Sequence, residues 1–406
     1  MLAGVIGERA WDAPALIRPL RISAIDFVAF AGFAVFVQTL NGLHRFLRQA
    51  SVWITYSTVK VIAVIAMLSV LGTIEAGVWG YVIASGVASV AALLASLRPI
   101  RSAGAEQDPG AAPSTGAMFR FGMPMAVHAM AMSAMLTVDL WAAKSVAVDG
   151  LEAGGYVAGS TLARVLYFVF IAFGEALFPA VARVYRDGSR EEGARDRAVD
   201  LARDGMGMLM VLLLPSVALA TGTAPESLAV VYGGSEAAAD RHFSDAAPFL
   251  TTLAPAAAAM TFIGVASMLI AATERAGRVA LALVCLLGFV VATVYLGAQS
   301  YGAQGAATGV LVATGLGAVA MTLWAIRLFR RNIVPVRHLV LAVVAAVLLH
   351  VLLRAWTPPG WWVFAYGAGL LVIVLAIFAR LGVLPWRGFK QKKKAAMEAI
   401  EAIPPQ

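Results

Sequence analysis

Five ionisable residues lie within segments of this sequence that are otherwise apolar. They are Lys60, Asp139, Lys144, Arg164 and Glu175. A charge at the centre of a membrane helix costs about 2.5–3.5 kcal/mol even on the mildest insertion scale, so such residues usually face a partner or a hydrated cavity. We take the cationic Arg164, Lys60 and Lys144 as candidates for binding an anionic substrate. We take the carboxylates of Asp139 and Glu175 as candidates for charge or proton coupling.

The spacing of three of these residues predicts a common site. Two long apolar segments, 119–146 and 155–181, are adjacent in sequence and are expected to form an antiparallel hairpin. Asp139 lies late in the first segment and Arg164 lies early in the second. At about 1.5 Å per residue, both side chains start about 10–14 Å below the same membrane surface. Glu175 follows Arg164 by about three helical turns, so it shares the same helix face at greater depth.

Two interpretations of these charges stay open. In the first, Asp139 and Arg164 form an ion pair that serves packing, and the other charged side chains reach toward the membrane interfaces. In the second, the charges line a hydrated, largely cationic cavity. The position of Arg164 and Glu175 on one face of one helix favours the second interpretation.

Composition assigns the chain to the membrane proteins. Hydrophobic residues make up 61% of the 406 residues and charged residues 13%, whereas charged residues make up about 25% of an average soluble domain. Many apolar runs approach the roughly 20 residues that cross a bilayer. We therefore predict an all-α polytopic membrane protein with about eleven transmembrane helices. The predicted spans are 24–43, 53–72, 77–97, 119–146, 155–181, 205–222, 247–271, 279–298, 304–327, 338–354 and 361–380.

Lysine and arginine residues concentrate in alternate loops, which is the pattern that the positive-inside rule produces. The sparse side of the membrane receives only Arg9, Arg18, Arg21, Arg241 and Arg354. The rule therefore predicts an outside N-terminus and a cytoplasmic C-terminus. Because the net charge of +8 is distributed in this way, it does not indicate a nucleic-acid partner.

Loop composition divides the chain further. The stretch 99–117 is rich in Gly, Ala and Pro and is interpreted as a cytoplasmic linker. It separates an N-terminal part of three predicted helices, 1–98, from a part of six predicted helices, 118–328. Two additional helices, 329–384, and a basic cytoplasmic tail, 385–406, follow.

The start of the central hairpin contains Gly122 and Pro124, which allow a helix to bend, so both are hinge candidates. Several methionines surround His128 there, and we favour adaptable packing over a copper(I) path. The single cysteine, Cys285, leaves no cysteine-based metal site. No Walker A sequence, histidine ligand pair or other enzyme motif is present. We therefore expect no enzymatic activity, catalytic residue, metal or cofactor.

The central hairpin also resembles a known family. The motifs that carry the resemblance are Phe121-Gly122-Met123-Pro124, Asp139, Gly155-Tyr156-Val157-Ala158 (one residue off the usual spacing) and Phe178-Pro179. The stretches LNGLHRF, GVWGYVIASGV and YGAQGAATGVLVATGLG are similar to the same family. In these motifs the chain resembles the polysaccharide (O-antigen or exopolysaccharide) flippases of the multidrug/oligosaccharidyl-lipid/polysaccharide exporter superfamily.

The resemblance implies a two-lobed bundle that works by alternating access. The implied function is to flip an undecaprenyl-diphosphate-linked oligosaccharide across the bacterial inner membrane for surface polysaccharide (lipopolysaccharide or exopolysaccharide) biosynthesis. Implied partners are this lipid-linked oligosaccharide, membrane lipids and polysaccharide polymerase or export machinery. Counted against the family's six-helix first lobe, the chain supplies only three helices there. We therefore expect an incomplete N-terminal lobe that lacks the first three helices.

Two alternatives remain open. A small-molecule or cation antiporter of the same superfamily should favour acidic over basic cavity residues. A non-transporting membrane scaffold of a polysaccharide export complex should tolerate neutralisation of all five buried charges.

Overall fold

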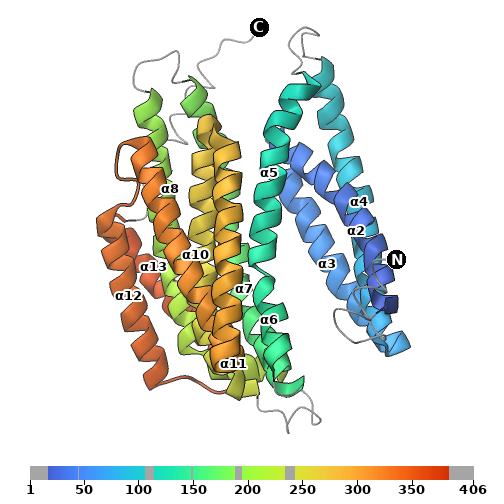
Figure 1. Cartoon of the computed structure of the whole chain (residues 1–406), viewed down its shortest axis with the longest axis vertical. Coiled ribbons are helices and arrows are strands. Elements are labelled where there is room, and N and C mark those ends of the chain that lie inside the picture. Colours follow the sequence, from blue (N-terminus) through green and yellow to red (C-terminus); the bar gives the residue numbers. More distant parts are fainter. Residues whose placement is uncertain are drawn as a thin grey trace. The chain divides into compact units, whose positions relative to one another are not determined.

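The computed structural model describes residues 17–43, 45–105, 114–147, 150–187, 194–233 and 243–383. Across these ranges the chain is helical and contains no β-strand, which confirms the all-α prediction. The helices run nearly parallel to one another within each compact unit (Figure 1). The predicted basic tail, 385–406, and the middle of the predicted linker lie outside the described residues.

The number of membrane spans agrees with the prediction. In the described part of the chain, 10 helices are long and apolar enough to cross a membrane. One of them, α11 (Ala276–Phe329), has 54 residues and is interrupted at Tyr301 and Gly302. Gly302 adopts φ 62° and ψ −151°, a conformation that is essentially restricted to glycine. Because α11 therefore contributes two spans, each of the eleven predicted segments has a helical counterpart, and the chain is a multi-pass membrane protein.

Contacts between helices divide the chain into two compact units, Met1–Ser114 and Thr115–Gln406, called unit 1 and unit 2 below. The helices of unit 1 are α2 (Ile17–Gly42), α3 (Phe46–Leu71) and α4 (Ile74–Ala105). Helix α4 packs against both α2 and α3. Both α4 and α5 extend into the residues interpreted as a linker, because α4 continues to Ala105 and α5 begins at Thr115.

Small residues shape unit 1. Gly72 ends α3 in the left-handed conformation, with φ 62°, and its N–H donates to the Leu68 carbonyl, so the chain can turn directly into α4. At Gly80, an added Cβ would lie 2.6 Å from the Cα of Val64, so only glycine allows α3 and α4 to approach so closely. The core of unit 1 consists of Phe33, Val37, Leu40, Val52, Ala88 and Ala92.

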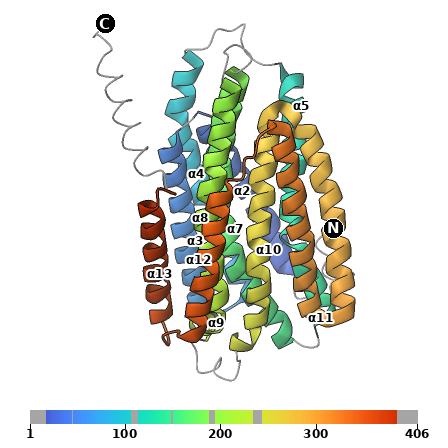
Figure 2. The same cartoon turned by 90° about the vertical axis from the view of Figure 1, so that its left-hand side faces the viewer.

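Unit 2 is a larger helical bundle. Its elements are α5 (Thr115–Met135), α6 (Val138–Val146), α7 (Gly150–Asp187), α8 (Ala194–Gly222), α9 (Ala224–Tyr232), the short helix η5 (Phe243–Ala246), α10 (Ala247–Ile270), the π-helical turn η6 (Ala271–Arg275), α11, α12 (Val336–Ala355) and α13 (Trp362–Arg380). Helix α10 is the most buried span and packs against α7, α8 and α11. Helices α12 and α13 lie on the outside of this bundle, against α8 (Figure 2).

The predicted span 119–146 is not one continuous helix. Helix α5 ends at Met135 and α6 begins at Val138, so Leu136 and Thr137 form a break between them. The Thr137 hydroxyl donates to the carbonyls of Ser133 and Ala134, at 3.1 Å and 3.2 Å, and the Ala134 carbonyl also accepts the Thr137 N–H at 3.1 Å. The break lies directly before Asp139 and therefore determines how that carboxylate is presented.

Candidate functional site

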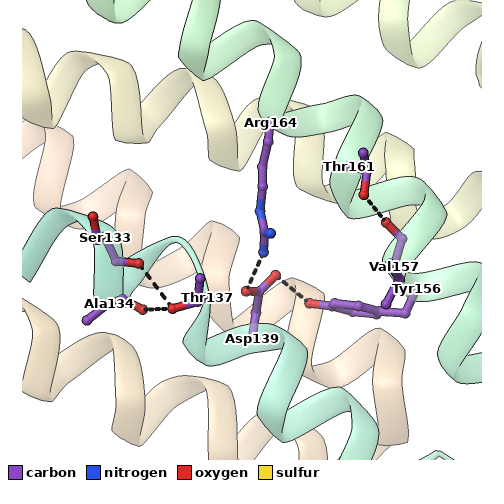
Figure 3. Close-up of polar contacts among 8 residues, drawn as sticks. All are labelled: Ser133, Ala134, Thr137, Asp139, Tyr156, Val157, Thr161 and Arg164. Carbon is purple, nitrogen blue, oxygen red and sulfur yellow. Dashed lines mark hydrogen bonds and ion pairs between the residues drawn. The ribbon is translucent and has the colours of Figure 1, made fainter. Parts of the chain in front are cut away.

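The centre of the candidate site is a buried ion pair between two helices of unit 2. Arg164 on α7 donates from Nη2 to Asp139 Oδ1 on α6 over 3.1 Å. The Tyr156 hydroxyl donates to the other oxygen, Oδ2, over 3.1 Å. Figure 3 shows Arg164 and Tyr156 approaching the carboxylate from different positions on α7. Both oxygens of Asp139 are therefore hydrogen-bonded, as a buried carboxylate requires.

The two charges differ in their access to solvent. Asp139 is only 4% exposed, whereas the Arg164 side chain retains 19% of its accessible surface. A guanidinium carries five N–H donors, and among the described residues its hydrogen bond to Asp139 uses one of them. Arg164 is thus held in place by Asp139 but keeps donors for a further anion.

The helix break explains why a carboxylate is tolerated at this depth. Asp139 lies in the first turn of α6. The first backbone N–H groups of a helix have no intrahelical partner, and the helix dipole is positive at that end, so a negative charge is stabilised there. In a continuous helix from 119 to 146, Asp139 would lie mid-helix and lack this stabilisation. The start of α6 at the α5–α6 break therefore stabilises the Asp139 charge.

One face of α7 supplies the other polar groups. Tyr156, Ser160 and Arg164 follow one another at intervals of about one helical turn and lie on the same side of the helix. The Tyr156 ring is fully buried and packs against Phe249 of α10, with ring centres 5.2 Å apart. Close approach of α10 depends on Gly159, where an added Cβ would lie 3.0 Å from the Leu250 nitrogen. The close packing of α7 against α10 at Gly159 thus helps to fix the position of the Tyr156 ring beside Asp139.

A small cavity adjoins the ion pair. Its volume is about 30 Å³, and its polar lining consists of Asp139, Arg164 and Ser160. Apolar residues of α5, α7, α10 and α11 and the break residue Leu136 form the rest of the wall. A cavity of this size accommodates about one or two water molecules, whereas drug-sized ligands occupy about 300–1,000 Å³. In this conformation the cavity can hold water beside Asp139 and Arg164, but it is too small for a saccharide.

The other predicted charges are not part of this cluster. Glu175 is exposed on α7, about 16 Å along the helix from Arg164. Lys144 is exposed in the last turn of α6. Lys60 belongs to unit 1, where its ammonium lies over the rings of Tyr56 and Tyr81, 5.6 Å and 4.6 Å from their centres. The roles of these residues in transport stay predictions.

The roles of Gly122 and Pro124 as hinges stay predictions. Helix α5 is continuous through Gly122 and Pro124, and the interruption lies instead at Leu136 and Thr137. His128 is buried and hydrogen-bonded to Ser267 of α10 over 2.7 Å. Within the described residues, no group of three or more His, Cys, Asp or Glu side chains could hold a metal ion.

Three features of the site were missed from the sequence. Tyr156 was noted only as part of a motif, and Ser160 was not considered, although their spacing from Arg164 places all three on one helix face. The break at Leu136 and Thr137 gave no usable signal, because neither residue is a strong helix breaker.

Comparisons with solved structures show which fold this is. The chain resembles lipid II flippase MurJ in an inward closed conformation, with a TM-score of 0.64 and 14% sequence identity over 90% of this chain and 74% of that one. It also resembles a MATE protein in complex with MaL6, with a TM-score of 0.59 and 16% identity over 77% of this chain and 70% of that one. The chain therefore has the exporter-type fold of these two proteins. No protein-family model matches the sequence, and no curated protein matches it.

Proposed function

We propose that this chain is a membrane transporter of the exporter superfamily that flips an undecaprenyl-diphosphate-linked oligosaccharide across the bacterial inner membrane, with its C-terminus in the cytoplasm. The product would serve surface polysaccharide biosynthesis. The observation that carries the proposal is the partly exposed Arg164 guanidinium, fixed by Asp139 at a helix break. The likeness of the fold to that of a lipid II flippase supports it.

The chemistry of Arg164 suits a diphosphate. A planar guanidinium binds phosphate oxygens through two parallel hydrogen bonds, and it stays charged at every physiological pH. Asp139 compensates this charge in the absence of substrate, which a buried cation requires. When a diphosphate arrives, it can take over the guanidinium donors, and Asp139 keeps its hydrogen bond from Tyr156. Lys60 and Lys144 would provide further positive charge along the anion path.

The small cavity implies that transport requires rearrangement. A space of about 30 Å³ cannot admit a lipid-linked headgroup, so the site must open during the transport cycle. Discontinuous helices are the elements at which transporters commonly form their binding sites and move. We propose that the break at Leu136 and Thr137 allows α6 to change its angle to α5 while α7 carries Arg164.

The antiporter remains the second candidate, because the fold is also that of a MATE protein. In that case Asp139 would bind a cation directly. The contact between Asp139 and Arg164 argues against this, since the guanidinium already occupies Oδ1. The scaffold hypothesis predicts that the charges affect stability alone.

Reconstitution in liposomes tests the proposal. The probe is a fluorescent polyprenyl-diphosphate-linked oligosaccharide, and the measurement is the fraction that becomes accessible to a membrane-impermeant quencher. We expect the wild-type protein to equilibrate the probe between leaflets and Arg164→Ala to abolish this activity.

The matched control is Arg354→Ala, which removes an exposed arginine from the last turn of α12. It should flip the probe at the wild-type rate. Equal activity in the Arg164→Ala and wild-type proteins would refute the assigned role of Arg164.

A further inference from the structure

A neutral polar pair joins two helices of unit 2 among otherwise apolar side chains. Gln304 on α11 donates from Nε2 to the Thr252 hydroxyl on α10 over 2.8 Å. The Thr252 hydroxyl in turn donates to the Pro248 carbonyl over 2.9 Å. Because a hydroxyl has one proton, Thr252 meets the Gln304 amide as an acceptor. The Gln304 side chain is therefore held with its nitrogen toward α10.

The oxygen of the same amide is buried without a partner. Among the described residues, Gln304 Oε1 accepts no hydrogen bond. Exchange of the amide oxygen and nitrogen would not remove the mismatch, because the nitrogen would then be the buried atom without a partner. A buried amide atom without a partner lowers the stability of the fold. Such an atom in a transport protein can mark a place where a further group binds.

The pair lies about one helical turn from the level of Arg164. Gly159 of α7 lies level with Leu250 of α10, and the two helices run in the same direction. Arg164 follows Gly159 by five residues, and Thr252 follows Leu250 by two. Thr252 therefore stops about three residues short of the level of Arg164, or about 4.5 Å along the helix axes. The next residue of α10, Leu253, already lines the cavity beside Arg164.

We propose that Gln304 Oε1 recognises the saccharide, by accepting a hydrogen bond from the sugar that is joined directly to the diphosphate. This inference rests on the proposed function, because it concerns the saccharide part of the same substrate. A diphosphate on Arg164 places the first sugar next to the guanidinium, and Gln304 is the neutral polar group nearby. A sugar hydroxyl or an acetamido N–H can donate to Oε1. Thr252 is a positioning residue, because it fixes the amide.

Movement of α6 would give the saccharide access to Gln304. Helix α6 packs against α11 and follows the break at Leu136 and Thr137. Gln304 lies two residues after Gly302, where α11 is interrupted, so it belongs to the first turn of the second half of α11. The rearrangement proposed above for the break would therefore change the packing around this turn. The opening that admits the diphosphate would also admit the sugar.

The test compares two probes in the liposome assay. One is the fluorescent polyprenyl-diphosphate-linked oligosaccharide. In the other, an alkyl spacer replaces the saccharide between the diphosphate and the fluorophore, so that lipid, diphosphate and label are kept. The variants are Gln304→Leu and Thr252→Val. The matched control is Gln299→Leu, which makes the same exchange at an exposed position of α11.

We expect the wild type and Gln299→Leu to equilibrate the saccharide probe about tenfold faster than the spacer probe, because the spacer leaves Oε1 without a donor. Gln304→Leu should lose this preference by slowing the saccharide probe alone. Thr252→Val removes the hydroxyl that positions the amide and should reduce the preference to about threefold. It serves as the test if Gln304→Leu does not fold.

The outcomes separate this inference from the proposed function. Three results would overturn the inference and leave the proposed function intact: no preference in the wild type, a preference that persists in both variants, or equal slowing of both probes in the variants. Movement of neither probe by the wild type would refute the proposed function and, with it, this inference.

Discussion

Exchange of the two charged partners in unit 2 for neutral side chains distinguishes a packing ion pair from a transport site. The variants are Asp139→Asn, Arg164→Gln and the double variant. Arg164→Gln leaves the Asp139 carboxylate, 4% exposed, with Tyr156 as its remaining side-chain partner. Loss of one partner of a buried pair costs about 3–5 kcal/mol. We expect about 3 kcal/mol, because the 19% exposure of Arg164 shows that the pair is not fully desolvated.

Asp139→Asn keeps an acceptor for Tyr156 and leaves a guanidinium that can be partly hydrated, so we expect a loss of about 2 kcal/mol. In the double variant neither charge is left unpaired, and we expect a loss of about 2 kcal/mol instead of the additive 5. The coupling of about 3 kcal/mol is at the upper end of the range for residues in contact. Reversible unfolding by SDS in mixed micelles measures the free energy of unfolding of each variant.

The same four proteins are then compared in the liposome assay. If Arg164 binds the anion, the double variant is about 1 kcal/mol more stable than Arg164→Gln but does not flip the probe. Flipping at the wild-type rate in the double variant would show that the pair serves packing alone and would refute the role assigned to Arg164. Strictly additive losses of stability would contradict the ion pair itself.

Three further predictions concern individual residues and use the same assays. Tyr156→Phe removes the hydrogen bond to Asp139 Oδ2 and should lower the free energy of unfolding by about 1 kcal/mol. An unchanged value would contradict that bond. In Gly305→Ala the added Cβ would overlap the Gly297 carbonyl, so this variant should lose about 2 kcal/mol or more of its free energy of unfolding. The control Gly315→Ala, whose added Cβ has no atom within 4 Å, should lose none. The Cβ added in Gly122→Ala also has no atom within 4 Å, so this variant should fold normally. If Gly122 is a hinge, the variant should flip the probe more slowly, and normal flipping would refute the hinge.

Much of the fold follows from simple features of the sequence. The lengths of the apolar runs predicted eleven spans, and the interruption of α11 at Gly302 corresponds to the predicted boundary between 279–298 and 304–327. Depth along two antiparallel helices also predicted that Asp139 and Arg164 lie at the same level, and the structure places them in contact. These predictions succeed because the bilayer fixes the length and direction of a helix.

The arrangement of side chains around each helix was less predictable. Hydropathy does not reveal a break inside a single membrane span. The segment 119–146 was therefore predicted as one helix, whereas the structure divides it into α5 and α6. Depth gives no information about which neighbour a residue faces. Lys60 was grouped with the anion-binding residues for this reason, although its ammonium lies over Tyr56 and Tyr81.

The central claim is that the protein translocates a lipid-linked anion. The most direct measurement compares two probes in the same wild-type proteoliposomes, a fluorescent polyprenyl-diphosphate-linked oligosaccharide and a fluorescent organic cation. We predict that the lipid-linked diphosphate equilibrates between the leaflets and that the organic cation does not accumulate under an imposed pH or Na⁺ gradient. Accumulation of the organic cation with no movement of the lipid-linked probe would contradict the claim and favour the antiporter.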